Sequence, residues 1–228
     1  MIKIKKKGLK FQDNIFITGF HGIGATGYWT IKYLVQNLDV KRIGFLNSGF
    51  IPPFTTTYKE SLVTPFELFK WRNLVFFKAE TTPYKEELFY TKLCKWVIKS
   101  KFKEVSLIGG LDINLRSDDS SYRIVHTSSF KPYGEIAKAK WLEPDQIIVG
   151  PVAMILNFFE INDFPAYAIL AYANVERVDP RAAASAIEIL EKQYNFNVDK
   201  SLLIRGAELI ESQWEPQRAK QKSESFYA

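Results

Sequence analysis

The chain has 228 residues and a mass of 26.3 kDa, and 46% of its residues are hydrophobic, so it can bury a substantial core. Thirty-one basic and 25 acidic residues give a net charge of +6, and five of the lysines lie within the first ten residues. Because the rest of the chain is nearly balanced, the composition argues against a basic face for nucleic acid, and the Lys-rich start around Ile2 and Ile4 favours an edge strand.

Cysteine usage and hydropathy predict a chain without disulfides, metal or membrane contact. Cys94 is the single cysteine and there are two histidines, which is too few for an internal disulfide or a thiolate-rich zinc site. The longest strongly apolar stretch, residues 147–159, is shorter than the roughly 20 residues that span a bilayer. The basic first residues are not followed by the apolar region of a signal peptide. We therefore expect a cytoplasmic protein with no membrane partner.

The first elements form a strand, a glycine turn and a helix. Residues 14–19 are a short apolar run that predicts a strand, and apolar residues recur at helical spacing over residues 31–38. Residues 41–47 predict a second strand. The pair Pro52-Pro53 then requires an extended loop, because proline fixes φ and disfavours helix in the residue before it.

The middle of the chain continues the alternation. Short runs with β-branched residues at 55–58 and 61–63 favour a small hairpin beyond the proline loop. Residues 73–79 predict another strand, and Pro83 is expected to start a helix that ends near Lys101. Residues 105–110 predict a buried strand that ends in two glycines.

The last third adds one strand and three helices. An apolar helix is expected over residues 151–159 and a strand over residues 166–173. Asp179 and Pro180 predict the start of a helix that includes residues 182–194, because aspartate is a good N-cap and proline fits the first turn. Asp199 similarly caps a last helix, from Ser201 to about Trp214.

These elements define a fold class and a domain boundary. Apolar strands that alternate with helices predict a three-layer α/β/α domain, residues 1–214, around a mostly parallel sheet. From residue 215 to 225 the chain has no apolar residue larger than alanine or proline, so it cannot bury enough surface to fold alone. Residues 215–228 are therefore expected to form a flexible tail.

A glycine motif after the first strand raises the possibility of a cofactor. Gly22-x-Gly24-x-x-Gly27 follows a predicted strand and opens a predicted helix, as in dinucleotide-binding folds. The acidic residue that would hold the ribose is missing, since the second strand ends in Asn47-Ser48-Gly49. We therefore interpret the glycines as a structural turn and expect no cofactor, and keep as the alternative an enzyme that binds a nucleoside or phosphate at this turn.

The other chemically capable residues form no catalytic signature. His21 and His126 could pair with Ser48, Ser128 or Asp112, but no Gly-x-Ser-x-Gly elbow supports a hydrolase. The pair Asp118-Asp119 lies in a polar stretch that favours a turn over a metal or acid–base site, and Cys94 lies inside a predicted helix as a core thiol. We expect no catalytic residues and no metal ligands.

The last three residues stand out as a candidate binding site. Phe226, Tyr227 and Ala228 form a hydrophobic-Tyr-any ending, preceded by a polar segment that can expose it. The terminal carboxylate can pair with a lysine, the tyrosine can pack and hydrogen-bond, and the phenylalanine can bury apolar area. The alternative interpretation is a frayed end without function.

Several segments together carry a family resemblance. They are residues 19–27 (Gly-Phe-His-Gly-Ile-Gly-Ala-Thr-Gly), Pro52-Pro53, Gly109-Gly110 and residues 178–183 (Val-Asp-Pro-Arg-Ala-Ala). With these segments the chain resembles the proteasome assembly chaperone family, in particular its archaeal members, over about residues 13–212. The resemblance implies a fold similar to nucleoside phosphorylases, used without known catalysis.

The resemblance also implies a partner. Archaeal members of the family carry a C-terminal hydrophobic-Tyr-any motif, and Phe226, Tyr227 and Ala228 are the matching positions here. We expect a non-enzymatic, ATP-independent homo-oligomer, such as a tetramer, that docks its tails on the α-subunits of the proteasome core particle as an assembly chaperone or activator. A third hypothesis is an interaction module for another partner, with the tail irrelevant.

Overall fold

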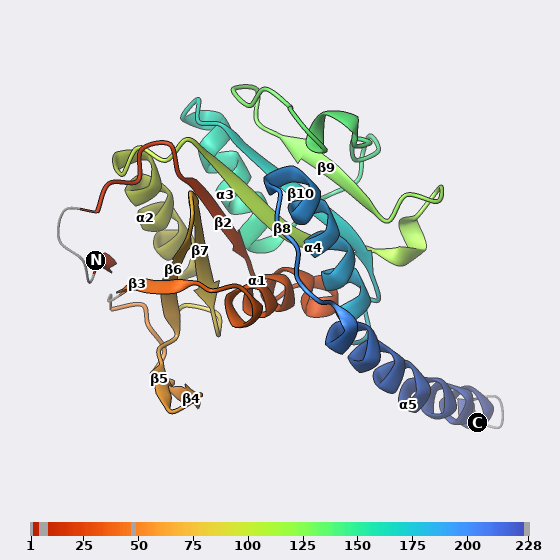
Figure 1. Ribbon diagram of the computed structural model, residues 1–228. Coiled ribbons are helices and arrows are strands. Elements are labelled where there is room, and N and C mark those ends of the chain that lie inside the picture. The colour runs from red at the N-terminus through yellow and green to blue at the C-terminus, as the bar shows by residue number, and fades with distance from the viewer. Residues whose placement is uncertain (1, 5–8, 47–48, 226–228) are drawn as a thin grey trace.

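The computed structural model describes residues 2–4, 9–46 and 49–225. One sheet has eight strands in the order β1-β3-β6-β7-β2-β8-β10-β9, and a separate hairpin joins β4 to β5 (Figure 1). The strands are β1 (Ile2–Ile4), β2 (Ile15–Gly19), β3 (Lys41–Leu46), β4 (Thr56–Tyr58), β5 (Ser61–Val63), β6 (Phe66–Trp71), β7 (Leu74–Ala79), β8 (Glu104–Asp112), β9 (Tyr122–His126) and β10 (Ala166–Ala173).

Five α-helices and three short 3-10 turns complete the described residues. The helices are α1 (Thr26–Asn37), α2 (Glu86–Lys99), α3 (Gly150–Ile161), α4 (Pro180–Tyr194) and α5 (Ser201–Ser225), and the turns are η1 (Ile23–Ala25), η2 (Ile113–Leu115) and η3 (Ile136–Lys138). Buried side chains of α2 and α3 share one hydrophobic core with the sheet, and those of α1, α4 and α5 share the other. The predicted three-layer α/β/α class is confirmed (Figure 1).

The sheet is mixed, with its parallel part at the centre. The neighbours β7, β2, β8 and β10 run parallel, whereas every pairing outside them is antiparallel. The expectation of a mostly parallel sheet holds for this centre. The sequence did not predict strands β6 and β9, and both pair antiparallel with their neighbours. Strand β1 lies at one edge of the sheet, as the Lys-rich start of the chain predicts.

The central strands are apolar because both of their faces are covered. Every residue of β10 is buried, and so is every residue of β7. A continuous apolar run is typical of a strand with helices on both sides. These two strands therefore fall almost where the sequence predicts them.

Helix α4 begins as its sequence predicts. The Asp179 carboxylate accepts hydrogen bonds from the backbone N–H groups of Arg181 at 3.1 Å and Ala182 at 3.2 Å, and also from Asn174 at 2.9 Å. Pro180 occupies the first helical turn, where no intrahelical N–H is needed. The same aspartate thus caps the helix and ties it to the end of β10.

The last helix is longer than the composition indicates. Helix α5 continues to Ser225 instead of ending near Trp214, and it extends away from the sheet and its covering helices (Figure 1). Glutamate, glutamine, lysine and alanine are good helix formers even without burial, which explains how the helix passes the point where large apolar residues stop. The division into a domain, residues 1–214, and a tail, residues 215–228, stays a prediction.

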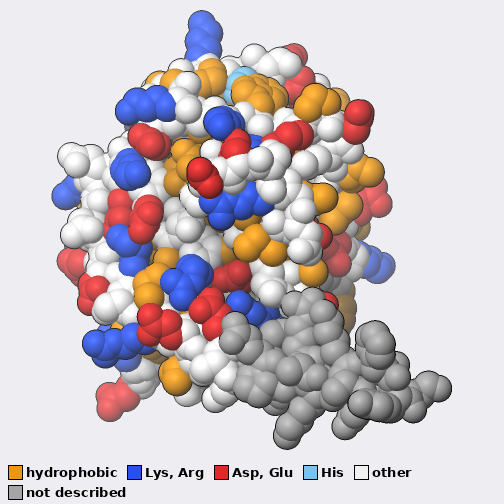
Figure 2. Space-filling model, turned by 90° about the vertical axis from the view of Figure 1, so that its right-hand side faces the viewer, with side chains coloured by type: hydrophobic (Ala, Val, Ile, Leu, Met, Phe, Trp, Pro, Cys, Tyr) orange, Lys and Arg blue, Asp and Glu red, His pale blue; other side chains and the backbone are white. Residues whose placement is uncertain are grey.

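None of the described helices combines the length and hydropathy that crossing a bilayer requires. On the face seen in Figure 2, basic and acidic side chains are interspersed, with no continuous basic stripe.

Candidate functional site

The glycines of the first turn let helix α1 approach the sheet closely. A Cβ at Gly19 would lie 2.5 Å from the carbonyl oxygen of Gly27, and one at Gly27 would collide with the carbonyl oxygen of Ile108 on β8. Gly24 has φ of +61°, a conformation that favours glycine. These contacts are within the protein, which supports the interpretation of this motif as a structural turn.

Replacing Gly27 by alanine is expected to destabilise the fold by about 3 kcal/mol, because the added Cβ forces α1 away from β8. Urea unfolding measures this loss. Gly22→Ala is the matched control, because no atom lies within 4 Å of its added Cβ and its φ of −173° suits any residue. We expect the control to stay within about 0.5 kcal/mol of wild type; equal losses in the two variants would contradict the close-packing role.

A small cavity lies beside this turn, at the carboxyl ends of β2 and β8. Its volume is about 150 Å³, which is below the roughly 300–1,000 Å³ of most ligand pockets. Its lining is mainly apolar and includes Phe20, Ile108, Gly109, Gly110, Val149 and Val152. Gly110 packs against the backbone of Ile23. Asn47 and Ser48, where a ribose-binding acid would be sought, lie outside the described residues.

Over the described residues, neither histidine forms a hydrogen bond with the side chain of a serine or an aspartate. His21 stacks on the Tyr28 ring with centroids 4.0 Å apart, and burial lowers the pKa of its imidazole, an effect that Glu80 opposes and Lys32 reinforces. His126 has Nδ1 2.9 Å from the carbonyl oxygen of its neighbour Thr127.

The other hydrolase candidates are occupied elsewhere in the described residues. The Ser128 hydroxyl donates to Glu160 at 2.6 Å, and Asp112 accepts from the N–H of Asn114 at 2.8 Å. Cys94 is buried, and burial raises the pKa of its thiol, which keeps it protonated as a core residue. Over the described residues, no group of three or more His, Cys, Asp or Glu side chains is placed to hold a metal ion.

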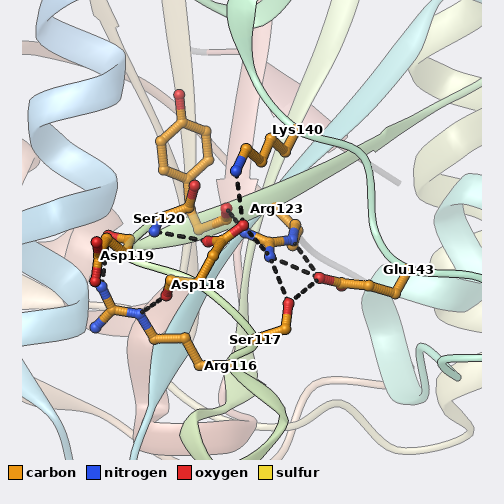
Figure 3. Close-up of polar contacts among 9 residues, drawn as sticks. Arg116, Ser117, Asp118, Asp119, Ser120, Arg123, Lys140 and Glu143 are labelled. Atoms are coloured by element: carbon orange, nitrogen blue, oxygen red, sulfur yellow. Dashed lines mark hydrogen bonds and ion pairs between the residues drawn. The ribbon is translucent and has the colours of Figure 1, made fainter.

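Asp118 belongs to an ion-pair network around a buried arginine (Figure 3). The Arg123 side chain is 1% exposed, and its Nη2 lies 2.6 Å from Glu143 and 3.1 Å from Asp118. Lys140 approaches Asp118 at 2.7 Å, and its hydrogen bond is the main cause that lowers the pKa of that carboxyl. The carbonyl oxygen of Asp119 accepts from Arg116 at 2.5 Å. The network holds this loop against β9, in agreement with the predicted turn.

A second polar network was missed from the sequence. Glu67 on β6 and Lys78 on β7 are cross-strand partners, and the Lys78 ammonium lies 3.2 Å from Glu67 and 2.7 Å from Glu80. Arg42 pairs with Glu67 at 2.9 Å, and the Tyr28 hydroxyl donates to Glu80 at 2.7 Å. The available signal was the presence of charged residues, Glu67 and Lys78 among them, inside two largely apolar runs, since buried charges need partners.

The predicted binding residues Phe226, Tyr227 and Ala228 lie outside the described residues. The helix that precedes them is anchored at its start, where Leu203 and Ala207 are buried. Arg181 of α4 holds Glu211 of α5 through two hydrogen bonds, at 3.2 and 2.9 Å. Helix α5 is therefore fixed to the core at its beginning and extends outward from it up to Ser225 (Figure 1).

The described residues define an α/β/α domain, with helices on both faces of a mixed sheet and a close-packed glycine turn after β2. The PAC2 family model matches residues 16–218 of the chain. The chain therefore belongs to this family. The uncharacterized protein MJ0106 of Methanocaldococcus jannaschii is 24% identical over 220 residues, covering 92% of this chain and 87% of that protein.

Solved structures share the fold over nearly the whole chain. Pyrococcus furiosus PbaA, described as an archaeal homolog of proteasome-assembly chaperone, matches with a TM-score of 0.74 and 22% identity, covering 99% of this chain and 100% of its own. Pyrococcus furiosus PbaB, described as an archaeal proteasome activator, matches with a TM-score of 0.73 and 17% identity, covering 96% of this chain and 98% of its own. The resemblance to the proteasome assembly chaperone family is confirmed.

Proposed function

We propose that this chain is a non-enzymatic, ATP-independent protein that binds the proteasome core particle, as an assembly chaperone or an activator. The observation that carries the proposal is membership of the PAC2 family together with the fold of PbaA and PbaB. The small apolar cavity at the glycine turn does not favour the alternative, an enzyme acting on a nucleoside or phosphate.

The proposed anchor is the chain end. Phe226 would fill an apolar pocket between α-subunits, Tyr227 would pack and hydrogen-bond, and the carboxylate of Ala228 would pair with a lysine there. Helix α5 supports this proposal because it leads away from the folded core and so leaves room for a large partner. A homo-oligomer, such as a tetramer, would present several chain ends to one α-ring.

A single added residue tests the position of the carboxylate. A glycine placed after Ala228 moves the charge out of register while it keeps Phe226 and Tyr227, so we expect binding to an archaeal core particle to fall at least about tenfold, as for a lost charge-assisted contact. Interferometry with immobilised core particle measures the affinity. Ala228→Ser, which keeps the carboxylate in place, is the matched control and should bind like wild type. Unchanged binding after the extension would refute the anchor.

A further inference from the structure

A groove with a volume of about 550 Å³ lies between helix α1 and the β4–β5 hairpin, and residues of strands β3, β6 and β7 also line it. Strand register places Thr56 opposite Val63 and Tyr58 opposite Ser61, so these four side chains share one face of the hairpin. All four line the groove. The hairpin is thus one wall, and α1 with Lys32, Val35 and Gln36 is the other.

The floor of the groove combines apolar side chains with the buried network described above. Val63 and Phe69 are buried there, and Val35 and Val40 lie half-buried beside them. The two carboxylates of the groove, Glu67 and Glu80, have side chains only 1% and 7% exposed. Burial raises the pKa of Glu80, but the hydrogen bonds from Lys78 and Tyr28 together outweigh this effect. The pKa of Glu80 therefore lies below its usual value, and the carboxyl is ionised at neutral pH.

The accessible charges of the groove are positive. Lys59, at the turn of the hairpin, is exposed and has its ammonium 5.4 Å from the Tyr58 ring. Lys32 has its ammonium 2.8 Å from the Tyr28 hydroxyl and near two aromatic rings. Within the described residues, neither lysine forms an ion pair with a carboxylate. Because the carboxylates of the groove are buried and paired, a ligand meets cations on both walls and apolar side chains below.

The hairpin has features of an element that contacts another molecule. It forms a two-stranded sheet of its own, and such a hairpin is marginally stable alone. Its turn residues Lys59 and Glu60 both have positive φ, 43° and 58°, which non-glycine residues rarely adopt. Its Leu62 side chain is 59% exposed, and Arg42 holds the hairpin by a hydrogen bond to the Leu62 carbonyl oxygen.

We propose that this groove, which we call the hairpin groove, binds an acidic peptide segment of a partner protein, with its carboxylates on Lys32 and Lys59 and an aliphatic side chain on the floor formed by Val35, Val63 and Phe69. Charge complementarity selects the acidic partner. The groove lining has one exposed aromatic ring, Tyr58, 40% exposed on the hairpin wall, and no series of rings on which successive bases could stack, so the apolar floor favours a peptide over a nucleic acid. The proposal uses none of residues 226–228 and does not rest on the proposed function.

The test uses the full chain and a fluorescent, capped peptide of four Glu-Leu repeats. Fluorescence anisotropy should show saturable binding that weakens with added salt, and peptides of Gln-Leu or Glu-Ser repeats should bind at least about tenfold more weakly, because each lacks one of the two features. Hydrogen exchange should show protection at residues 32–36 and 56–63.

Charge reversal locates the site. The double variant Lys32→Glu, Lys59→Glu should lose at least about tenfold in affinity for the Glu-Leu peptide. The control Lys99→Glu, Lys131→Glu changes net charge equally at exposed positions outside the groove lining and should bind like wild type. Equal effects of both double variants, no binding at millimolar peptide, or stronger binding of an oligouridine probe would each overturn the proposal.

Discussion

A chain that ends at Ser225 is expected to bind the proteasome core particle about 10²–10⁴-fold more weakly than the full chain, because it loses every chain-end anchor of the oligomer at once. One anchor of three residues is weak. Several anchors linked through one oligomer act at an effective concentration of about millimolar, so their avidity exceeds the affinity of a single chain end. Co-sedimentation with an archaeal core particle measures the difference.

The truncated chain needs a control for assembly. Residues 226–228 lie beyond helix α5, so the oligomeric state is expected to be unchanged, which size-exclusion chromatography with light scattering checks. A peptide of the last residues with an acetylated N-terminus and a free C-terminal carboxylate should compete only weakly with the full chain, because it lacks avidity. If the chain ending at Ser225 binds the core particle as tightly as the full chain, the folded surface and not the chain end is the anchor.

The elements that could be predicted from the sequence are those determined by local chemistry. Strand β10 runs from Ala166 to Ala173, as its continuous apolar run predicts, and Asp179 caps α4 as its position before a proline predicts. In both cases the signal and the structure lie within a few residues of each other. The same holds for the hairpin at residues 55–63.

The two strands that were missed, β6 and β9, carry charged residues that interrupt their apolar pattern. Strand β6 carries Glu67 and Lys70 among its apolar residues, and it turns into β7 through Arg72 and Asn73, which lack the usual Asn-Gly signature of a two-residue turn. Strand β9 is half polar, and its buried Arg123 depends on Asp118 and Glu143 from separate loops. Such pairing is set by tertiary structure, so local periodicity cannot reveal it.

The same reasoning separates the two candidate sites. The glycine turn could be interpreted as structural because the missing acidic residue was visible in the sequence, and its close contacts agree. The hairpin groove could not be predicted, because α1, β3, β6, β7 and a hairpin each contribute only a few residues to it. The binding role of Phe226, Tyr227 and Ala228 stays a prediction, and it could be made from the sequence because a chain-end motif needs no tertiary partner within its own chain.

Replacing Lys78 by methionine is expected to destabilise the fold by about 3–5 kcal/mol at pH 7, because it leaves two buried carboxylates without their shared cation. Glu67 keeps Arg42, and Glu80 keeps the hydrogen bond from Tyr28, but neither contact replaces the ammonium group between them. Methionine has a similar length, so the loss measures charge more than packing. Urea unfolding at pH 7 provides the measurement.

The pH dependence distinguishes an electrostatic loss from a packing defect. In the wild type the pKa of folded Glu80 lies below its unfolded value of about 4.3, so its pairing stabilises the fold fully above that pH and less as the pH falls through the folded pKa. In Lys78→Met, Glu80 loses the cation that lowers its pKa and takes up a proton more readily on acidification, so the difference between variant and wild type should shrink between pH 7 and pH 4. Lys70→Met is the control: Lys70 donates at 2.8 Å to the neutral Asn14 amide, so its removal should cost only about 1 kcal/mol at either pH. A loss in Lys78→Met that is the same at both pH values would show that the lysine stem, not its charge, stabilises this part of the sheet.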